Sequence, residues 1–168
     1  MLKLAVHLGG MLLPRDSEEV VGVINDIFTE FPPALRHGDY GHAEFHFVSV
    51  TDGRLYSSID SSLVLVADFA KGFGVLTWAC GPEVADRLSI SRQKEVGASA
   101  WVSLATDKIY REGVFLLDSH DSSAVADPST VLPIDQIREA VEEYCLTETG
   151  FRPEAIRWAQ STHTGQLL

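Results

Sequence analysis

The stretch PIDQIREAVEEYCLTETGFRPEAIRW, residues 133–158, contains a helix, its end and a following strand in one continuous run. Pro133 suits the first turn of a helix, where a backbone N–H would have no helical partner. Apolar side chains then recur at helical spacing and form one stripe: Ile134, Ile137, Val141, Tyr144 and Cys145. Gly150 falls where a left-handed C-terminal cap is needed, and Pro153 prevents continuation. We therefore expect a helix that turns at Gly150 and returns as a strand over 154–158.

The charged side chains of this stretch lie away from the apolar stripe. Asp135, Glu139, Glu142 and Glu143 are expected to face water. Arg152 is placed to meet the last helix carbonyls or a nearby carboxylate. The helix would thus pack one face on a core and present an acidic face outward.

The preceding segments are typical of a sheet that this helix could cover. The run over 1–14 predicts a first strand, and 16–31 predicts a helix capped by Asp16 or Ser17. Further strands are expected in the apolar and β-branched runs at 43–51, 62–69, 73–80, 98–105 and 113–118. The segment 62–69 is apolar on both faces, which indicates a central strand, and the short link to 73–80 indicates a hairpin.

The remaining segments are polar. Residues 34–42, 81–97 and 118–130 are expected to be loops, and the tail over 160–168 is expected to fray. This order of elements predicts a single α+β domain over 1–168, with helices packed on a mainly antiparallel sheet.

The chain is acidic, and unevenly so. Its 13 Lys and Arg against 24 Asp and Glu give a formal net charge of −11. Residues 61–110 are neutral, whereas the flanks carry −5 and −6. Phosphate groups would be repelled, so direct binding to nucleic acid or to an anionic membrane is not expected. A basic partner, or solubility alone, would account for the charge.

Two cysteines, Cys80 and Cys145, do not make a disulfide framework in a chain of this length. They indicate a reducing, cytoplasmic setting. The apolar start at 1–14 lacks a small-residue cleavage site for a signal peptide, and no run is long enough to span a bilayer.

The segment HAEFH, residues 42–46, is the strongest candidate for chemistry. On a strand, His42, Glu44 and His46 point to the same face and could ligate zinc or iron. His42-Ala43-Glu44 also matches half of the zinc deaminase signature, but the P-C-x-x-C half is missing. The alternative is a solvent-facing strand with polar outer residues, which we prefer. No cofactor is expected.

Other catalytic patterns are weaker. Asp118, His120 and Ser122 lie close in sequence, but triad members usually come from separate elements, and no G-x-S-x-G turn is present. Trp78 and Trp101, like Trp158, lie among apolar neighbours, which favours packing in or near the core over an interface role.

Three segments follow one another in an order that resembles a known family. GVLTW (74–78) is a hydrophobic strand that ends in an aromatic residue, and AWVSLA (100–105) is an aromatic-Val-Ser strand. The helix and strand of 132–158 then supply the most specific part: Ile137-Arg138-x-Ala140, Gly150, Arg152-Pro153 and Trp158. Over residues 60–158 the chain resembles the Imm-one family of bacterial polymorphic-toxin immunity proteins.

The resemblance implies a non-enzymatic cytoplasmic protein that binds the C-terminal domain of a cognate secreted toxin and blocks its active site. Toxins beside this family often act on nucleic acid, which implies a basic cleft that an acidic chain can occupy. We expect the contact on the last helix and the loop before it, at Asp118, Asp121, Asp127, Glu139, Glu142 and Glu143. Gly150, Arg152, Pro153 and Trp158 would be structural. The alternative function is a small metal-dependent enzyme that uses His42, Glu44 and His46.

Overall fold

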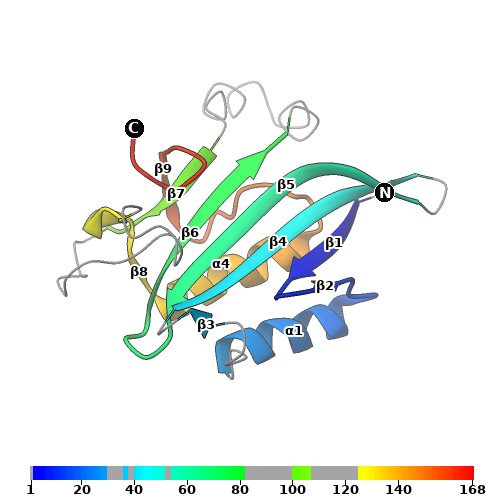
Figure 1. Cartoon of the computed structure of the whole chain (residues 1–168), viewed down its shortest axis with the longest axis horizontal. Helices are drawn as coiled ribbons and strands as arrows, with labels where there is room; N and C mark the ends of the chain where they lie inside the picture. Colours follow the sequence, from blue (N-terminus) through cyan, green and yellow to red (C-terminus); the bar gives the residue numbers. More distant parts are fainter. Residues whose placement is uncertain (1, 30–35, 38–39, 52–53, 82–99, 107–124) are drawn as a thin grey trace.

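An antiparallel sheet with the strand order β2-β1-β4-β5-β6-β7-β9 organises the molecule (Figure 1). The structure is a computed structural model, and it describes residues 2–29, 36–37, 40–51, 54–81, 100–106 and 125–168. The path strands are β1 (Leu2–His7), β2 (Met11–Leu12), β4 (Tyr40–Thr51), β5 (Arg54–Asp68), β6 (Phe73–Cys80), β7 (Ala100–Leu104) and β9 (Arg157–Gln160). Two short strands lie off this path: β3 (Arg36–His37) pairs with β4, and β8 (Leu132–Pro133) pairs with β6.

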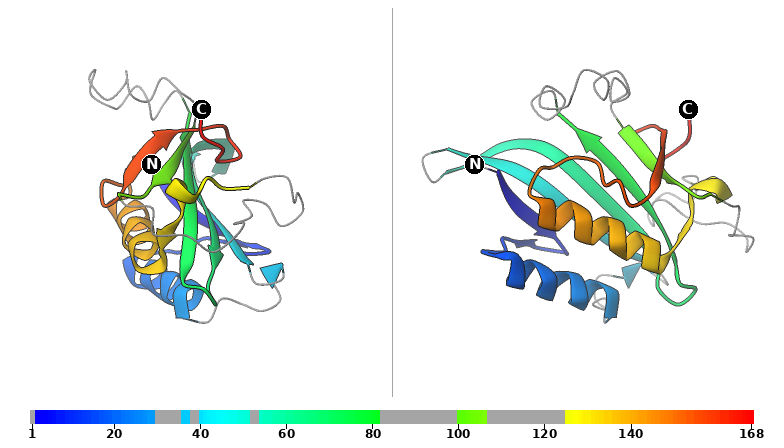
Figure 2. Two further views of the ribbon diagram at one scale, coloured as in Figure 1. Left: turned by 90° about the vertical axis from the view of Figure 1, so that its left-hand side faces the viewer. Right: turned by 180° about the vertical axis from the view of Figure 1, so that it is seen from behind.

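Two helices, α1 (Ser17–Thr29) and α4 (Ile134–Thr147), lie side by side on one face of the sheet (Figure 2). Their apolar stripes pack against the side chains that the strands present to that face, Phe45 and Phe47 of β4, Leu63 and Leu65 of β5, and Trp78 of β6. The predicted α+β class, with helices on an antiparallel sheet, is confirmed.

The predicted helices begin and end close to where the sequence placed them. Asp16 caps α1, because its Oδ1 accepts the backbone N–H of Glu19 at 3.0 Å. The predicted stripe of α4 is buried or half-buried, with Ala140 added to it. Pro133 is the N-cap of α4, one residue before the first turn.

A second, smaller core lies on the other face of the sheet. Val66, Val75 and Val102 point there and are covered by Ala126 and Val131. The segment that covers them contains a short 3-10 helix, η2 (Pro128–Thr130). Central strands β5 and β6 are therefore apolar on both faces, as the sequence of 62–69 predicted.

The sheet branches at β6, and a buried serine joins the branches. β6 pairs with β7 at Thr77 and beyond, but with β8 at Phe73 and Gly74. Between the two, the Ser103 hydroxyl accepts the Leu76 N–H at 3.1 Å and donates to the Thr130 carbonyl at 2.7 Å. One side chain thus satisfies backbone groups that neither ladder reaches.

Several predicted boundaries were wrong. The segment expected to be a loop over 34–42 contains β3 and the start of β4, and β5 begins at Arg54 instead of 62. β9 begins at Arg157 instead of 154. The tail does not fray: the Ser161 N–H donates to the Ala100 carbonyl at 3.1 Å, and Ser161 forms an antiparallel bridge with Leu167. The expected strand at 113–118 and most of the loop at 81–97 lie outside the described residues.

In the described part of the chain, no helix is both long enough and apolar enough to cross a membrane.

Candidate functional site

The outward surface of α4 carries the acidic residues that the sequence singled out, but they differ in their surroundings. Glu139 and Asp135 are exposed. Glu142 is half-buried and accepts a hydrogen bond from Arg138 Nε at 2.7 Å. The Arg138 guanidinium also donates to Asn25 Oδ1 of α1 at 2.6 Å, so this pair joins the two helices.

Glu143 is bonded within the chain, which the sequence did not predict. Its side chain is half-buried, and its two carboxylate oxygens accept the backbone N–H groups of Glu154 and Ala155, each at 2.8 Å. Hydrogen bonds from backbone N–H to an ionised carboxylate are among the stronger ones in proteins. Glu143 therefore holds the segment after α4 in place, which also explains why β9 begins three residues later than expected.

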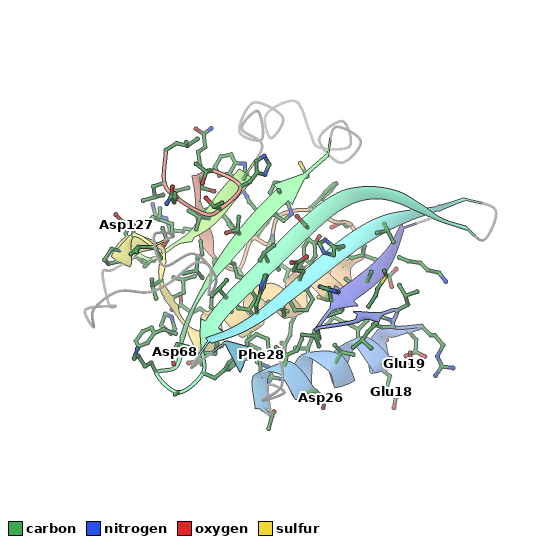
Figure 3. The ribbon with its side chains drawn as sticks, viewed as in Figure 1. Glu18, Glu19, Asp26, Phe28, Asp68 and Asp127 are labelled. Carbon is green, nitrogen blue, oxygen red and sulfur yellow. The ribbon has the colours of Figure 1, made fainter. Side chains whose placement is uncertain are left out.

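Helix α1 adds acidic side chains that the sequence reasoning did not assign to the surface. Figure 3 shows Glu18 at the start of α1 and Asp26 further along it, on the side away from the sheet. Both are exposed, and neither has a Lys or Arg partner among the residues the structure describes. The signal was present, because both lie off the stripe of Val20, Ile24 and Ile27, as Glu139 lies off the stripe of α4. We call the exposed acids Glu18, Asp26, Asp135 and Glu139 the helix face.

The predicted residues before α4 are placed only in part. Asp127 is exposed at the start of η2 (Figure 3), where its Oδ1 accepts the Ser129 N–H at 2.8 Å. It is therefore the N-cap of this short helix. Asp118 and Asp121 lie outside the described residues.

Gly150 has a positive φ of 70°, but it is not the C-cap of α4. That position is taken by Glu148, with a φ of 54°. Gly150 lies instead where the backbone passes close to the sheet, because a Cβ there would be 2.6 Å from Ser61 Oγ. The Trp78 indole N–H donates to the Gly150 carbonyl at 3.3 Å.

The residues after Gly150 make contacts within the chain. The Arg152 guanidinium lies over the Trp101 ring, 4.1 Å from its centroid, in cation–π geometry. The Trp158 indole N–H donates to the Pro153 carbonyl at 2.8 Å. Trp78 and Trp101 are buried and Trp158 is half-buried, as predicted.

The HAEFH side chains do share one face of β4. Glu44 lies between the two imidazoles, with its carboxylate 2.9 Å from His46 Nε2 and 3.5 Å from His42 Nε2. This carboxylate is thus engaged with its own strand neighbours. No group of three His, Cys, Asp or Glu side chains is arranged to hold a metal ion among the residues that can be described.

Two buried groups, the Cys145 thiol and the Tyr144 phenol, are held in their neutral forms. Burial raises the pKa of Cys145 and of Tyr144 well above their ordinary values of 9.0 and 10.0. The Tyr144 hydroxyl is bonded to Ser61 Oγ at 2.8 Å. Both cysteines are free thiols. At neutral pH these groups therefore act as packing residues.

Comparison with known proteins identifies the family. The sequence model described as Immunity protein Imm1 matches residues 12–160, which includes the 60–158 segment of the resemblance and extends it through α1. No curated protein matches the chain. Because the match covers most of the chain, this protein belongs to the Imm1 family of immunity proteins.

Proposed function

We propose that this immunity protein binds the C-terminal domain of a secreted bacterial toxin that acts on nucleic acid, and that it does so in the cytoplasm of the producing cell. The toxin's active-site cleft would be basic, because it must hold phosphate groups. The immunity protein would occlude that cleft and perform no reaction itself.

The observation that carries this proposal is the helix face. Glu18, Asp26, Asp135 and Glu139 are exposed on two helices that the Arg138–Asn25 bond joins. Their charges have no Lys or Arg partner in the described part of the chain. Exposed carboxylates on a rigid pair of helices are available to a basic surface, and the net charge of −11 would steer the encounter.

Three further acids remain candidates for this contact and also form hydrogen bonds within the fold: Glu142, Glu143 and Asp127. Their hydrogen bonds to Arg138, to the 154–155 backbone and to Ser129 fix their positions. Replacing all three glutamates of α4 would therefore change the fold and the charge together. A test of charge alone must use Asp135 and Glu139.

The test measures association with the C-terminal domain of the cognate toxin. Asp135→Asn with Glu139→Gln should lower the association rate several-fold at low salt, and the difference should shrink at high salt as screening increases. Surface plasmon resonance at two ionic strengths measures both rates. The dissociation rate should change less.

A matched control changes net charge equally on another surface. Gln160→Lys with Gln166→Lys alters two exposed residues of β9 and the tail. If the control slows association as much as the helix-face variant, net charge and not the helix face controls the encounter. If the parent protein neither binds the toxin domain nor protects cells that express it, the proposed function is wrong.

A further inference from the structure

A pocket of about 170 Å³ lies where α1 begins and α4 ends, next to β1 and β4. Its lining comes from four elements and the approach to α1: Lys3, Leu4, Pro14, Arg15, Asp16, Val20, Phe47, Cys145 and Glu148. It is distinct from the helix face, because none of the four acids that define that face lines it.

The lining divides into an apolar floor and a charged rim. Leu4, Val20, Phe47 and Cys145 are buried, with exposed fractions of 8% or less. Lys3, Arg15, Asp16 and Glu148 are exposed and mark the opening. Arg15 is already engaged, because its Nε donates to Glu19 Oε1 at 2.7 Å.

The size of the pocket suits one side chain. A dry engineered cavity of about 150 Å³ accommodates a benzene molecule. A pocket with an apolar floor and a polar rim is also the usual setting for the anchor residue of a protein interface.

The rim indicates the surroundings of the incoming side chain. With Arg15 paired to Glu19, the remaining rim charges are Lys3 against Asp16 and Glu148, and Glu18 lies in the first turn of α1, two residues from Asp16. The excess is negative. A side chain presented by a basic surface would therefore meet complementary charge around an apolar floor.

We propose that this pocket receives one apolar side chain, aliphatic or aromatic, from a basic surface of the toxin domain, and that this side chain anchors the complex. The inference rests on the proposed function and adds to it a contact that controls the lifetime of the complex. Loss of a buried anchor acts mainly on dissociation, whereas loss of the helix-face charges acts on association.

The test replaces residues that line the pocket with larger ones that fill it. Val20→Met extends a side chain from α1 into the space, and Cys145→Met does so from α4. Because a vacant pocket is filled, each variant should melt at or above the temperature of the parent. Each should weaken binding of the toxin domain by about thirtyfold or more, the effect of losing a hot-spot residue, chiefly through faster dissociation.

Val64→Met is the matched control, since Val64 is a half-buried valine that points to the opposite face of the sheet. It should bind as the parent does. If either pocket variant folds and binds the toxin domain with the parent's affinity, the pocket is not the anchor site, and the proposed function is unaffected. If the parent itself does not bind the toxin domain, both inferences fail. Two walls are used so that one misfolded variant does not decide the outcome.

Discussion

Gly150 shows how a single missing side chain can determine where a segment lies. Its φ of 70° is strained for other residues, and a Cβ would meet Ser61 Oγ at 2.6 Å. Gly150→Ala should therefore reduce the free energy of unfolding by about 2–4 kcal/mol, from backbone strain and disruption of the Ser61–Tyr144 hydrogen bond. Chemical denaturation measures the loss.

Gly72 provides the control for this prediction. It also has a positive φ, of 74°, but a Cβ there would have nothing within 4 Å. Gly72→Ala should lose only the backbone contribution, about 1–2 kcal/mol. Equal losses at the two glycines would show that the contact with Ser61 relaxes without cost.

At the scale of elements, Glu143 joins α4 to the segment that leads into β9. Glu143→Ala leaves two backbone N–H groups without their carboxylate, and we expect a loss of about 1–3 kcal/mol in the free energy of unfolding. Glu139→Ala, on the same helix and exposed, should change it by less than about 0.5 kcal/mol. Urea denaturation of the pair distinguishes them. A Glu143→Ala protein as stable as Glu139→Ala would mean that water replaces the carboxylate.

The elements also show what the sequence could and could not predict. Both described helices were predictable because their apolar residues repeat at helical spacing, which records burial directly. Gly150 was assigned to the helix cap because its sequence position fits that role, yet the C-cap of α4 is Glu148. Gly150 lies where a Cβ would meet Ser61 of β5, which is remote in sequence. Likewise, Glu143 lies off the apolar stripe of α4, and its sequence position did not reveal that its carboxylate accepts hydrogen bonds from the backbone of residues 154–155.

The residues that carry the family resemblance also differ in how well the sequence predicted their surroundings. Ile137 was predicted as a core residue from its spacing, and Ala140, which the predicted stripe did not include, is buried beside it. The position of Arg152 over the Trp101 ring was not predicted, because Trp101 lies on β7, far from Arg152 in sequence. Local pattern determines which side chains are buried, whereas the identity of a partner depends on the order of strands in the sheet.

For the whole molecule, the core predicts a loss of stability at alkaline pH. Burial raises the pKa of Cys145 and Tyr144 in the folded state, so the unfolded state releases these protons first. Stability is then full below the unfolded pKa values and falls as pH rises above about 9 for the thiol and about 10 for the phenol. Above its unfolded pKa, each group should lower the free energy of unfolding by up to about 1.4 kcal/mol per pH unit.

Urea denaturation between pH 8 and pH 11 measures this slope. In the Cys145→Ala variant, the free energy of unfolding should fall less steeply between pH 9 and pH 10 than it does in the parent. This expectation holds whatever the variant's stability at pH 8. Identical slopes in the two proteins would show that Cys145 ionises as readily in the folded state as in the unfolded state.

The position of β9 has a consequence for how the protein is made. β9 pairs with β7, which precedes it by roughly fifty residues, and the tail after β9 bonds to Ala100 of the same strand. Ribosomes add about 5–20 residues per second, so β7 waits for several seconds before its neighbour is synthesised. An uncovered strand edge invites pairing with another nascent chain. A premature stop before Arg157 would leave this edge of β7 without its neighbour, and we expect such a chain to aggregate.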